Sequence, residues 1–163
     1  MEKEVAKKYI RAGKILQKVV AEAKKSIKPG QKLLEIALDI EKSITRVARE
    51  GDGKGKPAFP VNLSINENAA HFTPSAKEEA VLNAGDVLKV DVGVHLDGYI
   101  ADTAFTLNPD NSHVALIEAA EKALENGLAI ARQGTSVGAI GKEIEKTIKE
   151  NGFNPVQNLS GHG

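Results

Sequence analysis

The chain has 163 residues, 41% of them apolar, and its 22 Lys and Arg balance 22 Asp and Glu, so the formal net charge at pH 7 is zero. This composition is typical of a globular chain that can bury a core, and it argues against a protein dedicated to nucleic acid binding. Cysteine is absent, which excludes disulfides and thiolate zinc sites. No apolar run approaches a membrane span of roughly 18 residues and the first residues do not resemble a signal peptide, so we expect a cytoplasmic location.

Two amphipathic helices are predicted in the first 50 residues. Between Glu4 and Ile27 apolar residues recur at steps of three and four, and Pro29-Gly30 ends the pattern. The same spacing returns between Lys32 and Arg49. The residues expected to face the core are Val5, Tyr9, Ala12, Leu16, Val19, Ala23 and Ile27 in the first helix, and Leu33, Ile36, Ile40, Ile44 and Val47 in the second.

Irregular chain is predicted after the second helix. Residues 51–56 read Gly-Asp-Gly-Lys-Gly-Lys, which indicates a surface loop. We expect extended chain from Phe59 to Ser64, followed by a loop that contains His71. Taken alone, His71 is an ordinary loop histidine, and Phe59 fits a core as well as a pocket.

The next two runs alternate between apolar and polar residues, which is typical of half-buried strands. A turn at Asp97-Gly98 is a strong hairpin signal, because a two-residue turn needs φ > 0 at both centres. That turn sets Gly93 opposite Asp102 and leaves Asp91 diagonal to it. A turn centred on Leu96-Asp97 instead sets Asp91 directly opposite Asp102. Both registers place the two aspartates on one face of the hairpin.

The aspartate pair has a chemical consequence in either register. Carboxylates whose Cβ atoms lie roughly 4.5–8 Å apart repel each other unless a cation or a shared proton intervenes. Hard oxygen ligands on a rigid hairpin suit Mn²⁺, Mg²⁺, Fe²⁺ or Co²⁺. Asp91 and Asp102 therefore predict a divalent metal site. On the spacing alone, two solvated strand acids remain the alternative.

Two more helices are predicted after Asn108-Pro109-Asp110. The first has Asn111 or Ser112 as its N-cap and reaches Arg132. The second runs from Ser136 to Glu150 and ends at Asn151-Gly152, a pair typical of helix C-termini.

This second helix pair resembles the first. A shift of 104 residues lays Gly30 on Gly134, and both pairs lead into similar segments, Pro60–Ser64 and Pro155–Ser160, which we expect to be strands. We interpret residues 1–163 as a single domain with an internal repeat. Residues 1–110 form the complete first half, and residues 111–163 form part of a second half.

Four motifs then occur in one order: Pro-Ala-Phe-Pro-Val-Asn-Leu-Ser-Ile-Asn-Glu at residues 57–67, Ala69-Ala70-His71, the aspartate hairpin, and Asn-Leu-Ser-Gly-His at residues 158–162. Their combination closely resembles type 2 methionine aminopeptidases, the archaeal form in particular, over essentially the whole chain. The resemblance implies the α+β pita-bread fold (creatinase/aminopeptidase-like) in truncated form: a helix-helix-sheet unit followed by two helices and one strand of a second unit. It also implies a metalloprotease that removes the N-terminal methionine from peptides and nascent proteins.

The resemblance also implies roles for individual residues. Asp91, Asp102 and His162 correspond to metal ligands, with Asp102 expected to bridge two divalent ions (Mn, Co, Fe or Zn). His71 corresponds to the histidine that hydrogen-bonds the substrate near the scissile amide, which is a catalytic and substrate-binding role. Phe59 corresponds to a wall of the methionine side-chain pocket.

The chain departs from the family pattern at its C-terminal end. Two glutamate ligands and a further substrate-side histidine are expected beyond residue 163, so three of the five implied metal ligands are present. We therefore expect the site to be incomplete in this chain. A fragment of a longer enzyme, a homodimer that completes the two-fold, and a deliberately shortened half all fit this pattern.

Two other functions stay open. One is a catalytically inactive pita-bread fragment or binding module, against which the retained Asp91 and Asp102 argue. The other is an Xaa-Pro dipeptidase, which shares the aspartate pair, although the Pro57–Ser64 segment favours the methionine enzyme. The expected partner is the N-terminus of a peptide or nascent protein, with neither a membrane nor a dedicated nucleic acid.

Overall fold

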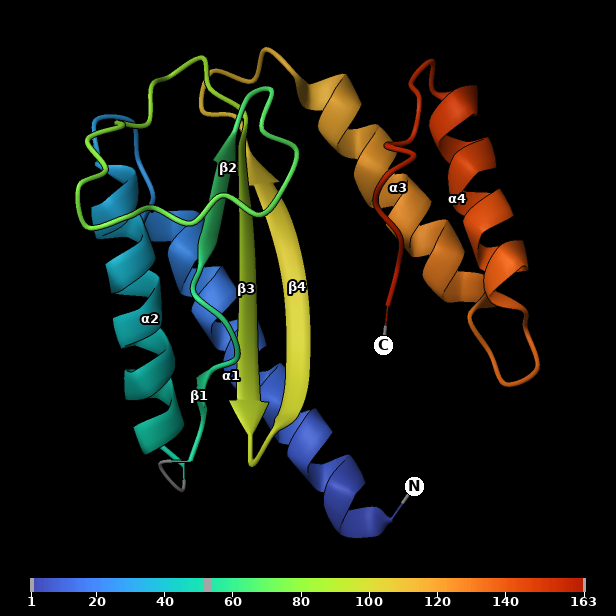
Figure 1. The fold of residues 1–163 in the computed structure, drawn as a ribbon. Helices are drawn as coiled ribbons and strands as arrows, with labels where there is room; N and C mark the ends of the chain where they lie inside the picture. Colours follow the sequence, from blue (N-terminus) through green and yellow to red (C-terminus); the bar gives the residue numbers. More distant parts are fainter. Residues whose placement is uncertain (1, 52–53, 163) are drawn as a thin grey trace. The chain divides into compact units, whose positions relative to one another are not determined.

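The computed structural model describes residues 2–51 and 54–162, which form two compact units, residues 1–111 and residues 112–163. The first unit contains α1 (Lys3–Ser26), α2 (Leu33–Arg49), β1 (Lys56–Pro57), β2 (Asn62–Ile65), β3 (Leu88–Leu96) and β4 (Tyr99–Leu107), and the second contains α3 (Val114–Ile130) and α4 (Val137–Glu150) (Figure 1). Among the helices described, none is both long and apolar enough to cross a membrane.

The first two helices form where the apolar spacing predicts them. Their ends differ from the predicted ends by one residue or less, and Gly30, with φ +93°, allows the sharp turn between them. All five residues expected to face the core from α2 are buried, as are Ala12, Leu16, Val19 and Ala23 of α1. Tyr9 is an exception with 43% exposure, because its ring lies edge-on against Tyr99 at 5.4 Å instead of entering the core.

The sheet is antiparallel throughout. β3 is its central strand and pairs with β1 and β2 along one edge and with β4 along the other. α1 packs against β3 and β4, and α2 packs against α1, β1 and β2, so both helices cover the same face of the sheet (Figure 1). The core between the helices and the sheet includes Leu63, Leu88, Val90, Val92 and Val94, all with 0% exposure.

One short strand lies where the sequence predicted only a loop. Lys56 pairs with His95 and Pro57 with Val94, so chain near the end of the glycine-rich stretch joins the sheet as β1. Proline has no backbone N–H and is confined to strand edges, which fits this position. The rest of the predicted loop surrounds residues 52–53, which lie outside the described residues.

The second unit is a pair of packed helices. Small residues of α3 allow α4 to approach closely: a Cβ built on Gly127 would lie 3.0 Å from Cγ1 of Ile144. Ser136, where the sequence predicted the helix to begin, is the N-cap of α4, because its hydroxyl accepts a hydrogen bond from the Ala139 N–H at 3.2 Å. The cap predicted for α3, Asn111 or Ser112, was wrong, since the N-cap residue is His113 and Asn111 is in a left-handed turn with φ +58°.

The strand expected at Pro155–Ser160 is not formed. These residues are turn or irregular, and all except Pro155 are exposed. A strand needs a partner for its backbone N–H and C=O groups, and none of the strands described in the chain pairs with this segment.

Candidate metal centre

The β3–β4 hairpin brings Asp91 and Asp102 to one face of the sheet. Gly93 lies opposite Asp102 and Asp91 lies opposite Ala104, so the two aspartates are diagonal neighbours. Diagonal Cβ atoms in such a pair lie within roughly 7–8 Å. The turn residues are Asp97 and Gly98, with φ +51° and +87°, which selects the first of the two registers that the sequence allowed.

This face points away from the helices. Val90, Val92 and Val94 alternate along β3 with the residues of the aspartate face, and their side chains have no exposed surface. Asp91 is half-buried and Asp102 is exposed. The carboxylates can therefore be reached from outside the core.

Phe59 lies on the same face, against Gly93. A Cβ built on Gly93 would come within 2.9 Å of both Cδ1 and Cζ of the Phe59 ring. Because the side-chain direction of Gly93 is shared by Asp91 and Asp102, the half-buried ring forms an apolar wall beside the two acids. The structure thus brings together three of the residues that the sequence singled out.

His71 lies in the loop after β2. The neighbouring Phe72 ties this loop to β2, since its carbonyl accepts the Leu63 N–H at 2.7 Å and its N–H donates to the Ser64 hydroxyl at 3.2 Å. His71 itself is exposed, with φ +66°. A left-handed histidine is uncommon and directs attention to a functional role. The histidine is held beside β2, the strand that pairs with the Asp91 end of β3.

Asn62 is a residue of this face that the sequence analysis missed. It pairs with Asp91 across β2 and β3, and its amide donates to the Thr73 hydroxyl at 2.8 Å and to the Pro60 carbonyl at 3.0 Å. The alternation of buried Val61 and Leu63 around it was the signal that places it on the outer face.

His162 belongs to the second unit, at the exposed end of the irregular segment. Within residues 2–51 and 54–162, no group of three or more histidines and acids is placed to hold a metal ion. The candidate centre in the first unit is therefore the aspartate pair. Two carboxylates on a rigid hairpin suit an oxygen-preferring divalent ion, and additional donors are needed to fill its coordination sphere.

One cation belongs to the same face. Lys89 precedes Asp91 by two residues, and its ammonium donates to the Asn66 carbonyl at 2.7 Å. Burial lowers the pKa of Lys89, while the charge of Glu67 acts in the opposite direction. Lys89 therefore fastens the loop after β2 to the sheet next to the aspartates.

Comparison with known proteins identifies the family. The sequence model of metallopeptidase family M24 matches residues 7–163 of this chain. The chain belongs to this family. It is 52% identical over 155 residues to a methionine aminopeptidase of Pyrococcus horikoshii, covering 95% of this chain and 50% of that protein. It is 49% identical over 164 residues to a methionine aminopeptidase of Archaeoglobus fulgidus, covering 100% and 54%.

The fold agrees with this assignment. The crystal structure of a methionine aminopeptidase from Thermotoga maritima superimposes with a TM-score of 0.83 at 28% identity, covering 100% of this chain and 66% of that one. The predicted pita-bread α+β fold of the M24 metallopeptidases is thereby confirmed. The chain spans about half the length of the curated relatives it matches.

Proposed function

We propose that the chain takes part in the metal-dependent removal of the N-terminal methionine from peptides and nascent proteins. The observation that carries this proposal is the convergence of Asp91, Asp102 and Phe59 on one accessible sheet face. The similarity to archaeal methionine aminopeptidases supports it. The expected substrate is the free N-terminus of a peptide, and the expected location is the cytoplasm, where nascent chains emerge.

In this proposal Asp91, Asp102 and His162 would serve as ligands of divalent ions, two of them in a complete site, and Mn, Co, Fe or Zn are the candidates. Such ions supply a nucleophilic water near neutral pH and polarise the scissile carbonyl. A homodimer is one source of the additional ligands that the site needs.

The remaining roles belong to side chains of the first unit. Phe59 offers a flat apolar surface for the unbranched methionine side chain and keeps water from that side of the aspartates. His71 donates a ring N–H to the oxygen of the scissile amide as negative charge develops there. Its place beside β2 and its left-handed backbone support this assignment.

The experiment is hydrolysis of the tripeptide Met-Ala-Ser by the 163-residue chain, treated with chelator and then supplied with Mn²⁺ or Co²⁺. Turnover that disappears in Asp102→Asn and persists in Asp39→Asn supports the proposal. Asp39 is a matched control because its carboxylate is exposed on α2 and pairs only with Lys42 among the described contacts.

A folded chain that binds no Mn²⁺ and leaves the tripeptide intact contradicts the proposal for this chain. Cleavage of a dipeptide with proline in second place, in preference to Met-Ala-Ser, points instead to the Xaa-Pro dipeptidase alternative.

A further inference from the structure

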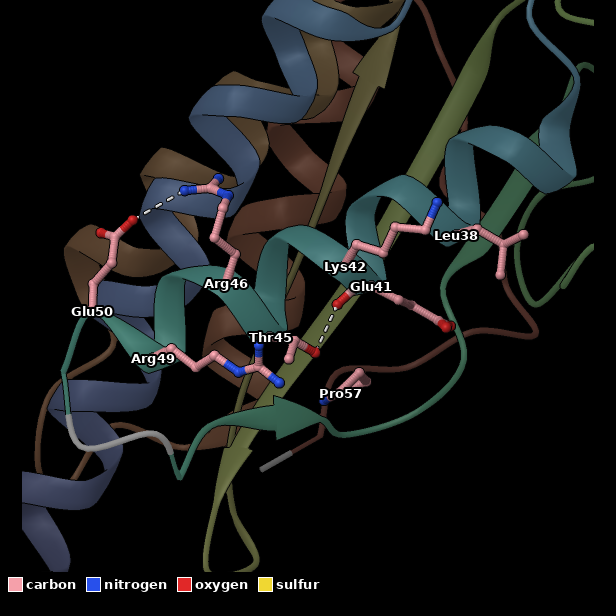
Figure 2. Close-up of a pocket in the computed structure, with 8 residues that line it drawn as sticks. All are labelled: Leu38, Glu41, Lys42, Thr45, Arg46, Arg49, Glu50 and Pro57. Atoms are coloured by element: carbon pink, nitrogen blue, oxygen red, sulfur yellow. Dashed lines mark hydrogen bonds and ion pairs between the residues drawn. The ribbon is translucent and has the colours of Figure 1, made fainter.

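A groove runs between α2 and the start of the sheet, and it reaches Phe59 at one end. One wall is formed by Leu38, Glu41, Thr45 and Arg49 of α2, which recur at steps of three and four residues. The other wall is the segment Pro57–Pro60, held to β3 by the β1 pairing and by the Ala58 N–H, which donates to the Gly93 carbonyl at 2.9 Å. We call this the α2–β1 groove (Figure 2).

The groove is open to solvent and has a mainly apolar lining. Two adjoining depressions of about 730 and 750 Å³ share Glu41, Thr45, Arg49 and Pro57 in their lining. Leu38 is 44% exposed at one end, and Pro57, Phe59 and Pro60 supply apolar surface along the other wall.

The charges along the groove are not balanced. Its acids already have partners: Glu50 pairs with Lys18 and with Arg46 at 3.0 Å, and Glu41 accepts the Val61 N–H at 3.4 Å. The side chains of Arg49 and Lys56, in contrast, make no hydrogen bond or ion pair with any other residue that the structure describes. Figure 2 shows Arg49 on the side of α2 that faces β1, while Arg46 turns toward Glu50.

We propose that the α2–β1 groove binds an extended acidic peptide segment of a partner protein, with an apolar side chain against Leu38 and Pro57 and carboxylates on Arg49 and Lys56. The apolar surface beside two cations, neither of which has a partner among the described residues, matches such a segment in shape and charge. Nucleic acid fits less well, because its affinity rises with the number of phosphates neutralised, and Arg49 and Lys56 can neutralise only a few of them. This binding goes beyond peptide hydrolysis and does not depend on a bound metal.

The test uses the 163-residue chain and a fluorescein-labelled peptide, Gly-Asp-Glu-Leu-Asp-Glu-Leu-Asp, followed by fluorescence anisotropy. We expect saturable binding that weakens with added salt. Arg49→Gln and Lys56→Gln should each weaken it about two- to fivefold, the range expected for exposed charge pairs, and the double variant about tenfold. Leu38→Ser should weaken it as well, because it removes the apolar contact and leaves the cations in place.

Matched controls come from cations outside the groove. Lys25→Gln and Arg132→Gln remove one charge each from exposed positions and should leave the affinity unchanged. Equal binding by the wild type and the Arg49/Lys56 double variant would overturn the proposal. Tighter binding of a labelled oligonucleotide that is lost in the same variant would assign the groove to nucleic acid instead. Concentration-dependent dimerisation that requires Arg49 would assign it to a second copy of the chain.

Discussion

The ring of Phe59 lies on the backbone of Gly93, at the point of β3 that faces Asp102 across the hairpin. A Cβ at residue 93 would lie 2.9 Å from two ring atoms, well inside the contact distance of about 3.5–4.0 Å between carbons. The ring therefore fills the space that a larger residue would occupy. Gly93 therefore makes room for the proposed methionine wall next to the carboxylates, whose own positions follow from the strand register.

Gly93→Ala should displace the Phe59 ring. Insertion of a methyl group into such a contact typically costs about 1–3 kcal/mol, so we expect a lower free energy of unfolding. Metal binding by the aspartates should persist, because their own positions on the strands do not change. Urea unfolding followed by Mn²⁺ titration of the folded variant measures both effects.

The control for that substitution is Gly13→Ala. Gly13 is in α1, and nothing beyond the adjacent helix residues lies within 4 Å of the position that a methyl group would take, so alanine should stabilise the helix by about 0.5–1 kcal/mol. Phe59→Ala combined with Gly93→Ala should cost less than the sum of the two single changes, because removal of the ring makes room for the methyl group. Strict additivity would contradict the contact.

Asp91→Asn and Asp102→Asn should each abolish stabilisation by Mn²⁺. A ligand that binds only the folded state raises the free energy of unfolding by about 2.7 kcal/mol at 100 times its Kd, and loss of one carboxylate removes an anionic ligand. Melting temperatures with and without Mn²⁺ measure the effect. A wild-type melting temperature that Mn²⁺ leaves unchanged would show that the aspartate pair does not bind this ion.

Stability should also depend on Asp86 at acid pH. Its side chain is buried and accepts hydrogen bonds from the Asn66 amide at 2.9 Å and from the Asn83 N–H at 2.8 Å. The Asn66 bond, followed by the Asn83 bonds, holds the pKa of Asp86 below its ordinary value. As the pH falls, Asp86 is therefore protonated in the unfolded chain before it is protonated in the folded chain. The stability that this carboxylate contributes is complete above about pH 4 and is lost as the pH falls through the lower folded pKa.

Asp86→Asn is the variant that isolates this contribution. An amide cannot accept all of these hydrogen bonds, so we expect a loss of about 1–3 kcal/mol at pH 7 that shrinks as the pH falls below 4. Urea unfolding between pH 3 and 7 measures the difference in the free energy of unfolding between the wild type and the variant. The contributions of exposed carboxylates such as Glu4 and Glu145 are the same in both proteins and cancel in this difference. A difference that stayed constant with pH would contradict the assignment.

The parts of the fold that the sequence predicts are those with long regular patterns. The apolar residues that recur along α1 and α2 leave little freedom for the helix boundaries, and the alternation of β3 fixes its buried face. The aspartates share a face in either register for the same reason.

What the sequence leaves open depends on contacts between distant residues. The sequence allowed two positions for the turn, and the structure places it at Asp97 and Gly98. Nothing in the order of residues places Phe59 on Gly93. Pro155–Ser160 resembles Pro60–Ser64, but only the latter lies beside a strand that can pair with it. Gly30 and Gly134, aligned by the predicted repeat, both have left-handed backbones, with φ +93° and +89°. The repeat itself stays a prediction.

The hairpin turn gives the last prediction, because it connects the two strands that carry Asp91 and Asp102. Gly98 has φ +87°, which costs an alanine roughly 1–2 kcal/mol, so Gly98→Ala should lower the melting temperature. Slippage of β4 by one residue along β3 would turn Asp102 toward the helices and would move Phe105 of β4 out of the core. We expect the core to hold the register, and the Mn²⁺ response to survive in the destabilised variant.

Asp97→Asn is the matched change at the other turn position. Asparagine tolerates the left-handed backbone that Asp97 adopts at φ +51°, so only the exposed ion pair with Lys8, at 2.9 Å, is lost, and the change in stability should stay below about 1 kcal/mol. Melting curves of both variants with and without Mn²⁺ distinguish a loss of stability caused by turn strain from a loss of the Mn²⁺ response caused by a change of register. If Gly98→Ala lost the Mn²⁺ response while it kept the wild-type melting temperature, the turn and not the core would determine the register, and the metal face would depend on that one glycine.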